Sequence, residues 1–428
     1  MDSPPLRRAL DPWGCDSLVH NHPADIPVFS VQDRWSSETR PVGTSDHYMP
    51  ETDVAIVGGG LTGCGIAAHL IRLLDLDRVT LFEPGNALLQ QLYYRIRAID
   101  QGFMRSPLYS HIAPDGDLSL LDVARLSWPD LTPFERKQVR FALGRQRALV
   151  SSDLFFRHAN YVVKMYGLQD RTSRVRVRQA TQQRDGTWHV VGEDGRVTCA
   201  RIVILCSGGK PRDRSSPQRR QFDPFDLLGY RLAIEGGKAT VVGGGISAFH
   251  AVTKLVRHGV DVQWRIRRPL EYRCFDFDPF YARREGQLWL ESADPVARAR
   301  AIAREKRGTL PPELAAVLER EAYRERVSID VMKEMPQKAN ELSGNEVTIL
   351  ATGLTSDDSI AIRSFGGDAA GLYEAGLAAV GELGPAAASV EGVRLFVEKN
   401  IDSISRRLAR RFERRSQFMA VTGHAAIT

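Results

Sequence analysis

Two glycine clusters, each directly after a short apolar run, carry the clearest chemical signal in this sequence. In the first cluster, Gly58, Gly60 and Gly63 stand at the spacing G-x-G-x-x-G. The first glycine permits a tight turn, the second lets the backbone approach a pyrophosphate, and the third lets a helix pack closely on a strand. Leu61 and Thr62 would add free N–H groups at the start of that helix, where its dipole favours an anion. We therefore expect a bound dinucleotide at this turn.

An acidic residue in the next segment supports this interpretation. Residues 54–57 and 79–82 are apolar runs typical of buried parallel strands, with a helical pattern between them. The second run ends at Glu83, twenty positions after Gly63. A carboxylate there can accept hydrogen bonds from ribose hydroxyls. A glycine triplet alone would also fit an ordinary turn between a strand and a helix. A triplet between a strand and a helix, with an acid at the end of the next strand, is far more specific for a dinucleotide site.

The second glycine cluster repeats the pattern later in the chain. Gly243, Gly245 and Ala248 give the spacing G-x-G-x-x-A after an apolar run, and Ile246 and Ser247 would begin the following helix. An alanine at the last position still allows a helix to pack closely on a strand. We therefore expect a second dinucleotide at this turn.

The position that holds the acid in the first unit holds an arginine in the second. Arg268 stands twenty positions after Ala248, and Arg267 precedes it. A guanidinium can bond two oxygens of a 2′-phosphate, whereas an acid binds ribose hydroxyls. The pattern favours NADPH over NADH for this unit. The alternative is a group of surface arginines on an exposed strand end.

The remaining patterns place both clusters in an α/β fold. Alternating residues between 175 and 205, with two Asp-Gly pairs, predict a small antiparallel meander. We expect two Rossmann-like dinucleotide-binding domains. Residues 1–50 are expected to form an N-terminal extension, and residues 51–215 the first part of the first domain. Residues 216–342 would form a second domain inserted in the first. Residues 343–428 would complete the first domain and add a C-terminal helix.

Several other segments carry weaker signals. Residues 1–50 fit either a flexible leader or a flap over a neighbouring domain or subunit, and residues 90–128 are expected to be loop rather than one continuous helix. A capping box at residues 132–135 predicts a helix that runs to about residue 149. Residues 280–342 are charged and helical, and no chemistry is evident in them.

Composition narrows the class further. The 428 residues are 43% hydrophobic and 26% charged, and no apolar run approaches the roughly 20 residues of a membrane span. The five cysteines are scattered and odd in number, which favours a protein of the reducing cytoplasm. None stands at C-x-x-C spacing, which counts against a zinc site and a redox dithiol. The net charge of +6 allows a nucleic-acid partner, but the arginine-rich C-terminal pattern fits a solvated helix face better. We expect neither nucleic acid nor membrane as a partner, and the sequence leaves a homo-oligomer open.

The order of these motifs resembles one known architecture. Two glycine clusters, an Ala351-Thr352-Gly353 strand end and a glycine-opened helix at Gly384-Pro385 follow one another as in flavoproteins with two dinucleotide-binding domains. Over residues 51–415 the chain is most similar to the NADPH-dependent flavin monooxygenases that include amine and amino-acid N-hydroxylases. This resemblance implies that FAD binds the first unit and NADPH the second. It also implies that Thr352 and Gly353 lie near the domain junction, and that the helix after Gly384 points its N-terminus at the flavin.

The same resemblance implies a reaction and its candidate residues. NADPH would reduce FAD, O2 would form a C4a-hydroperoxyflavin, and an amine or amino-acid nitrogen would take the distal oxygen. Arg105 and Ser106 lie in the segment that passes the flavin in the N-hydroxylases, although Arg105 fits an ordinary loop salt bridge nearly as well. Two alternatives remain: an NADPH-dependent flavin dehydrogenase or reductase without oxygen insertion, and a non-enzymatic flavin-binding interaction protein. The fingerprints of Baeyer–Villiger and dimethylaniline-type monooxygenases are absent before Gly243.

Overall fold

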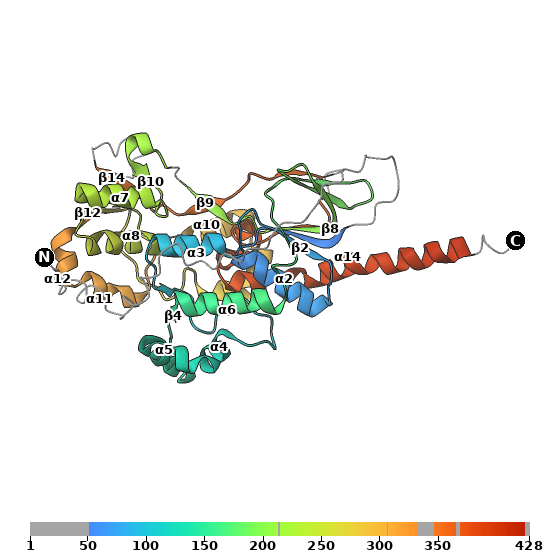
Figure 1. Cartoon of the computed structure of the whole chain (residues 1–428), viewed down its shortest axis with the longest axis horizontal. Helices are drawn as coiled ribbons and strands as arrows, with labels where there is room; N and C mark the ends of the chain where they lie inside the picture. The colour runs from blue at the N-terminus through green and yellow to red at the C-terminus, as the bar shows by residue number, and fades with distance from the viewer. Residues whose placement is uncertain (1–50, 213–214, 306, 333–345, 365–368, 424–428) are drawn as a thin grey trace, which may run out of the picture.

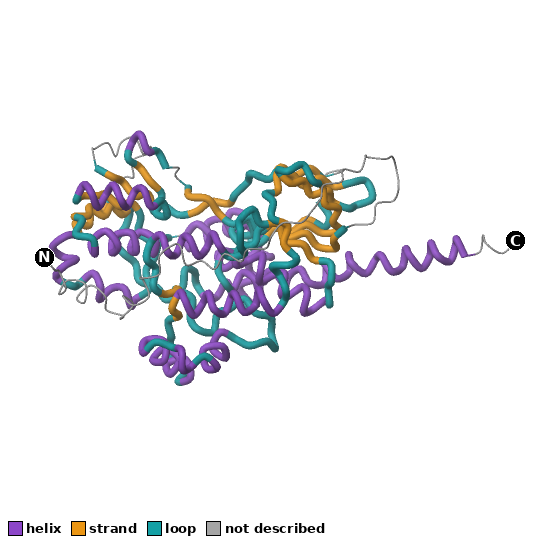
Figure 2. Tube along the Cα trace, viewed as in Figure 1, coloured by secondary structure: helices purple, strands orange, loops and turns teal. Residues whose placement is uncertain are grey.

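Two large β-sheets, one mixed and one parallel, lie at opposite ends of the body of the molecule, with helices packed around and between them (Figure 1). This computed structural model describes residues 51–212, 215–305, 307–332, 346–364 and 369–423. The expectations for residues 1–50 therefore lie outside the described residues. The long C-terminal helix extends away from the body as a single rod (Figure 2).

The first sheet has a parallel core flanked by an antiparallel meander. Its parallel strands run in the order β17-β8-β1-β2-β5. Their bounds are Leu372–Glu374, Val197–Leu205, Thr52–Val57, Val79–Phe82 and Thr172–Ser173. The two apolar runs expected to be strands before and after the first glycine cluster are β1 and β2, joined by helix α2 (Leu61–Leu74).

Strand β1 is apolar throughout because both of its faces are covered. Val54 and Ile56 face a core that includes helix α2. Ala55 and Val57 face a second core on the other side of the sheet, formed with the meander. A strand buried on both faces needs apolar residues at successive positions, so alternation disappears from its sequence.

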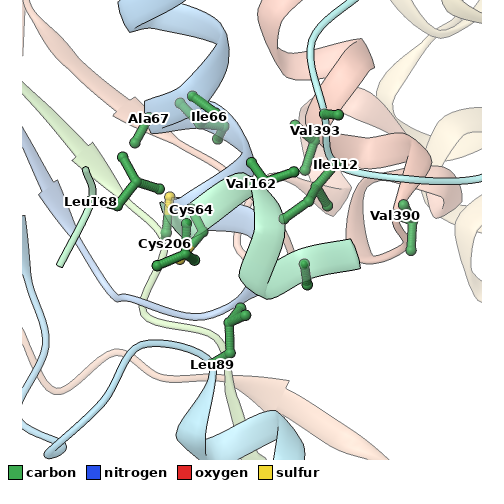
Figure 3. Close-up of a cluster of buried hydrophobic side chains, with 14 of the residues drawn as sticks. Cys64, Ile66, Ala67, Leu89, Ile112, Val162, Leu168, Cys206, Val390 and Val393 are labelled. Carbon is green, nitrogen blue, oxygen red and sulfur yellow. The ribbon is translucent and has the colours of Figure 1, made fainter. Parts of the chain in front are cut away.

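Three helices cover one face of this sheet. Helix α2 packs against α6 (Ser152–Met165) and against α14 (Glu391–Gly423). Figure 3 shows Cys64 and Ala67 of α2 in one apolar cluster with Val162 of α6 and Val393 of α14. The last helix of the chain therefore helps to hold the first helix of the described chain in place.

The predicted meander covers the other face. Strands β6 (Val177–Gln182) and β7 (Trp188–Gly192) pair antiparallel, and β7 pairs antiparallel with the first half of β8. Trp188 is fully buried between this meander and the sheet. Strand β16 (Ala361–Arg363) adds to the edge at β6.

The second sheet consists of five parallel strands in the order β10-β14-β11-β12-β13. Their bounds are Gln221–Phe222, Val347–Leu350, Lys238–Val242, Asp261–Ile266 and Val327–Val331. Helices α7 (Leu227–Gly236) and α8 (Ile246–Arg257) pack on this sheet. The predicted fold class, α/β with two Rossmann-like units and a meander, is confirmed.

Three details differ from the sequence-based expectations. Strand β14 pairs with β10 and β11, so it belongs to the second sheet although the boundary expected at residue 343 assigned it to the first. The capping box forms, but helix α5 (Pro133–Leu143) stops short of residue 149 because the chain turns at Gly144 and left-handed Arg145. The stretch expected to be loop contains helices α3 (Gln90–Ala98) and α4 (Leu120–Leu126).

The two units are joined by paired linkers and by a long excursion of the second unit. Strands β9 (Gly209–Pro211) and β15 (Leu354–Ser356) run antiparallel where the chain passes between the sheets. Between β12 and β13 the chain makes short helical elements that pack on the C-terminal part of the first unit. The remaining helices and strands are β3 (Phe103–Met104), β4 (Val150–Ser151), α9 (Arg284–Ser292), α10 (Pro295–Glu305), α11 (Ala315–Leu318), α12 (Glu321–Arg326) and α13 (Val380–Leu383).

No helix in the described part of the chain has the length and apolar character that a membrane span requires. Contacts between the units include a polar one at the end of α3. Lys254 on α8 pairs with Asp100 at 3.3 Å and donates to the carbonyl oxygen of Ala98 at 2.8 Å. One turn earlier on α8, buried His250 lies edge-on to Phe103, with ring centroids 6.0 Å apart.

The burial of His250 makes stability depend on pH. Burial, with a smaller effect from Arg257, lowers the pKa of His250 to about 3. The unfolded chain, with an ordinary histidine pKa near 6.5, therefore binds the proton first as the pH falls. We expect this residue alone to remove about 2 kcal/mol of stability between about pH 6.5 and pH 5.

The variant His250→Leu should show a smaller fall in melting temperature between these pH values than the wild type. His189→Leu, on strand β7 of the other unit, is the matched control and should fall as the wild type does. An equal fall in His250→Leu and the wild type would contradict the assignment.

Candidate functional site

The first glycine turn is locked between the ends of two neighbouring strands. Gly58 has φ +117°, and a β-carbon placed on it would lie 2.2 Å from the carbonyl oxygen of Cys206. The Gly58 N–H donates to the carbonyl of Phe82 at 2.9 Å, and the Cys206 N–H donates to the carbonyl of Val57 at 2.8 Å. Only glycine fits here, because both the backbone conformation and the space exclude a side chain.

The other two glycines differ in their surroundings. A β-carbon on Gly63 would lie 1.9 Å from the carbonyl oxygen of Gly58, so helix α2 touches the turn directly. A β-carbon on Gly60 would meet no atom of the described residues within 4 Å, so no described part of the chain covers this glycine. In the structure, Gly58 forms the turn, Gly60 leaves room above it, and Gly63 lets the helix touch it. This is the arrangement that binding of a pyrophosphate requires.

The N-terminus of α2 is open for an anion. Its N-cap is Gly60, which provides no side-chain cap for the first N–H groups of the helix, at Leu61 and Thr62. By contrast, Ser119 and Thr132 cap helices α4 and α5 with their hydroxyls. Uncapped N–H groups and the positive end of the helix dipole form a phosphate site.

Glu83 lies beside this turn, as its spacing predicts. Its carboxylate accepts from the N–H of Gly59 at 2.9 Å and from the N–H of Gly85 at 2.9 Å. These bonds fix both oxygens at the edge of the glycine turn while leaving lone pairs for further donors. The carboxylate therefore stands where ribose hydroxyls of a bound dinucleotide would approach.

The second glycine turn has the same construction. Gly243 has φ +132°, and a β-carbon on it would lie 2.2 Å from the carbonyl oxygen of Ala351. The Gly243 N–H donates to the carbonyl of Arg265 at 3.0 Å, and the Ala351 N–H donates to the carbonyl of Val242 at 2.8 Å. Gly245 is the N-cap of α8 and likewise has no side-chain cap. This helix N-terminus, with Ile246 and Ser247, is the second candidate phosphate site.

The two arginines expected to bind the 2′-phosphate of the second dinucleotide follow the end of β12. Arg267 and Arg268 are exposed, and no ion pair to either appears among the described residues. The strand end lies close to the turn, since a β-carbon on Gly244 would be 3.9 Å from Ile266 Cγ2. Both guanidinium groups are therefore free to meet a phosphate near this turn.

One feature of the second turn has no counterpart at the first among the residues that the structure describes. Gly308, from the excursion between β12 and β13, lies directly on it: a β-carbon on Gly308 would be 2.7 Å from the nitrogen of Gly245. Residues 280–342 were expected to carry no chemistry, and this contact was not predicted. The available sign was a glycine among charged helical segments, and Gly286 in the same stretch is another.

The structure does not support Arg105 as a group that faces a reacting oxygen. Its guanidinium is buried and donates to the carbonyl oxygen of Thr309 at 2.8 Å and to the Thr309 hydroxyl at 2.6 Å. It also pairs with Asp276 at 2.5 Å. The salt-bridge interpretation of Arg105 is the one that the structure shows. Ser106 is half-buried, and no hydrogen bond of its hydroxyl is found within the described residues.

The helix expected at Gly384-Pro385 is also different. Gly384 has φ +77°, and only a 3₁₀ turn, η8 (Pro385–Ala388), follows it. The α-helix α14 begins later, at Glu391. A β-carbon on Gly384 would lie 2.4 Å from Leu290 Cδ1, so α9 covers this glycine. The expected helix N-terminus is therefore displaced and partly covered.

Two further expected residues lie where the chain crosses between the sheets. Gly353 has φ +100° and its carbonyl accepts from the Arg212 N–H at 3.0 Å, beside Thr352 at the end of β14. At the first site, a β-carbon on Gly376 would lie 3.3 Å from Thr62 Oγ1. Gly376, which no sequence pattern predicted, thus brings the C-terminal part of the chain to the first turn of α2.

Comparisons with known proteins agree with this geometry. The family model described as "Lycopene cyclase protein" matches residues 53–223, which hold the first glycine turn and the strands around it. That match covers less than half of the chain and so bears on the first unit alone. By sequence, no curated protein matches the chain.

Solved structures match over most of the chain. An ornithine N-hydroxylase from Kutzneria sp. 744, with reduced FAD, NADP⁺ and L-ornithine, has a TM-score of 0.61 at 13% identity, covering 86% of this chain and 100% of its own. A mutant flavin monooxygenase from Stenotrophomonas maltophilia has 0.51 at 14%, covering 83% and 99%. A bacillithiol disulfide reductase from Bacillus cereus has 0.50 at 16%, covering 84% and 99%.

The fold and the two glycine turns define the class of this protein. It has the architecture of flavoproteins with two dinucleotide-binding domains, and the predicted resemblance to that architecture is confirmed.

The spacing between the glycines and their neighbours predicts opposite effects at Gly63 and Gly60. Gly63→Ala forces a β-carbon into the Gly58 carbonyl and should destabilise the protein by at least about 2 kcal/mol, as overpacking does. Gly60→Ala should leave the melting temperature of the cofactor-free protein unchanged, since its β-carbon meets nothing. Thermal unfolding of both variants measures this, and equal melting temperatures for the two would contradict it.

Proposed function

We propose that this chain is an FAD- and NADPH-dependent monooxygenase that hydroxylates a small nucleophilic substrate, with an amine or amino-acid nitrogen as the atom oxidised. One observation carries the proposal: two glycine turns of the same geometry are followed by different charges. Glu83 stands beside the first turn, whereas Arg267 and Arg268 follow the strand beside the second. An acid suits the ribose of FAD and an arginine suits the 2′-phosphate of NADPH.

The residues of the first unit fit the ADP part of FAD. Gly60 leaves space for the pyrophosphate, and the N–H groups of Leu61, Thr62 and Gly63 would donate to it. Glu83 would accept from the ribose hydroxyls. Bound FAD supplies the redox chemistry of the reaction with O2, and the protein supplies binding, orientation and exclusion of water.

The second unit would bind NADPH in the same way. Gly243 and Gly245 form the turn, Ile246 and Ser247 begin the helix, and Arg267 and Arg268 would hold the 2′-phosphate. Thr352 and Gly353, at the end of β14, would line the passage between the two cofactors. Gly384 would lie near the flavin, and Ser106 is our remaining candidate to face the substrate, because its half-buried hydroxyl keeps a free hydrogen-bonding capacity.

The substrate class rests on similarity rather than on a site. The ornithine N-hydroxylase matches along its whole length and was solved with an amino acid that carries a side-chain amine. This supports an amine or amino-acid substrate for the present chain.

A second function is an NADPH-dependent flavin reductase that inserts no oxygen. The bacillithiol disulfide reductase, which shares the fold with a TM-score of 0.50, favours it. Among the described residues no disulfide is available to relay electrons, since Cys64, Cys199, Cys206 and Cys274 are free. Burial also raises the pKa of the Cys64 and Cys206 thiols, which makes them poor nucleophiles.

The fate of the O2 that is consumed distinguishes the monooxygenase from the reductase. We expect purified protein loaded with FAD to consume NADPH and O2 faster when a suitable amine or amino acid is added. The product should gain the mass of one oxygen atom, and isotopically heavy O2 should label it. NADPH oxidation that no such compound stimulates, with all O2 recovered as peroxide, would support the reductase instead.

Arg268→Glu tests the assignment of the second unit. Loss of a charge-assisted hydrogen bond worth about 1.5–3 kcal/mol should weaken NADPH binding by about tenfold or more. NADH binding should hardly change, because NADH has no 2′-phosphate. Lys238→Glu makes the same charge change at the opposite end of this sheet, on exposed Lys238, and should affect neither. Equal losses for NADPH and NADH in Arg268→Glu would refute the role of this arginine.

A further inference from the structure

A short segment of the chain covers the second glycine turn. Residues 307–310, here called the strap, lie in the excursion between β12 and β13, immediately before η6 (Pro312–Leu314). A β-carbon on Gly308 of the strap would lie 2.7 Å from the nitrogen and 3.1 Å from the α-carbon of Gly245. Conversely, a β-carbon on Gly245 would lie 3.5 Å from the α-carbon of Gly308. The strap backbone therefore rests on the glycine whose N–H would face a pyrophosphate.

The first glycine turn lacks such a cover within the described part of the chain. A β-carbon on the equivalent residue, Gly60, would meet no described atom within 4 Å. The two turns are otherwise built alike, each pressed against the carbonyl of a neighbouring strand end. Nothing in the described residues stands in the way of a pyrophosphate at the first turn, but at the second it would meet the strap.

Arg105 of the first unit holds the strap in this position. Its guanidinium reaches Thr309, the neighbour of Gly308, through both the carbonyl oxygen at 2.8 Å and the hydroxyl at 2.6 Å. The same group donates to the carbonyls of Arg273 and Phe275 and pairs with Asp276. Arg105 thus ties the strap and the segment at 273–276 to a loop of the other unit.

The far end of the strap is anchored in the second unit itself. Leu310 is fully buried in the core of that unit. Its N–H donates to the carbonyl of Glu271 at 2.9 Å, and its carbonyl accepts from the Arg273 N–H at 2.8 Å. Gly308 and Arg307, by contrast, are exposed. The strap is therefore held at Thr309 and Leu310 and free of cover at its tip.

We propose that the strap competes with the pyrophosphate of NADPH for the second glycine turn, and that Arg105 is the positioning residue that keeps the strap closed. This inference rests on the proposed function, in which the second unit binds NADPH. Binding then requires the tip of the strap to lift from Gly245. The measured affinity for NADPH is lower than the intrinsic affinity by the fraction of molecules in which the strap is open.

Gly308 is the residue that permits the closed position. Any side chain at this position would collide with the backbone of Gly245, so Gly308→Val favours the open strap without touching Arg105. Arg105→Gln favours it by a different route, since it removes the charge-assisted bonds to Thr309. Two independent variants therefore predict the same gain.

The experiment measures binding of NADP⁺ to FAD-loaded protein by titration calorimetry. We expect Arg105→Gln and Gly308→Val to bind NADP⁺ about tenfold more tightly than the wild type, a change in the dissociation constant worth about 1.4 kcal/mol. Lys254→Gln is the matched control, because it breaks another polar contact between the units, with Asp100, that does not involve the strap. It should bind NADP⁺ as the wild type does.

Hydrogen exchange provides a second measurement. Its expected change would not occur if Arg105 only stabilised the fold. Ligand binding ordinarily slows exchange, but here saturating NADP⁺ should speed exchange of the backbone N–H groups in the strap, while those at the start of α8 slow down. In Arg105→Gln the strap should exchange rapidly even without NADP⁺.

The outcomes separate this proposal from the function on which it rests. Unchanged or weaker NADP⁺ binding in both Arg105→Gln and Gly308→Val, with FAD retained and wild-type binding measurable, would overturn the strap and leave the NADPH site intact. Failure of the wild type and of every variant to bind NADP⁺ would overturn the NADPH assignment, and the strap with it.

Discussion

The architecture depends on how closely one stretch of backbone can approach another at two glycine turns. In each unit the turn is pressed against the carbonyl of the adjacent strand end, at Cys206 in the first and Ala351 in the second, with no room for a β-carbon. This contact fixes where the following helix begins and where the next strand ends. The uncapped helix N-terminus therefore takes up the same position relative to the turn in both units. The residues after the neighbouring strand differ in charge and in register. Ile266 holds the position that Glu83 has in the first unit, and Arg267 and Arg268 follow it.

The common construction explains why the first unit can be built from distant parts of the chain. Its sheet takes β1, β2 and β8 from before the second unit and β17 from after it, and α14 then packs on α2. The paired linkers β9 and β15 carry the chain out and back side by side. The strand ends at Cys206 and Ala351, which touch the two glycine turns, thus lie near the crossing, which brings the two candidate cofactor sites toward one junction.

Elements that depend on neighbouring residues could be predicted from the sequence. The strands around both turns, the helices after them and the meander follow from apolar runs and glycine spacing, and they form where the sequence indicates. The failures involve contacts over long distances in the sequence. Arg105 was a candidate to face the reacting oxygen and fitted a loop salt bridge nearly as well. Its neighbours in the sequence cannot reveal its partner Thr309, which lies 204 residues away. No local pattern shows that α9 covers Gly384, that β14 joins the second sheet, or that Gly308 rests on Gly245.

The two units meet through apolar as well as polar contacts. Three residues of the first unit, Ile99, Phe103 and Leu149, lie buried in the core of the second. Hydrogen bonds and ion pairs add to this interface, from Lys254 to Asp100, from Arg147 to Glu313 and from Arg105 to Thr309. The apolar contacts fix how the units pack on each other, whereas a polar contact can hold one short segment in one of two positions. A single charge-assisted bond, worth about 1.5–3 kcal/mol, is enough to decide which of two arrangements of such a segment is populated.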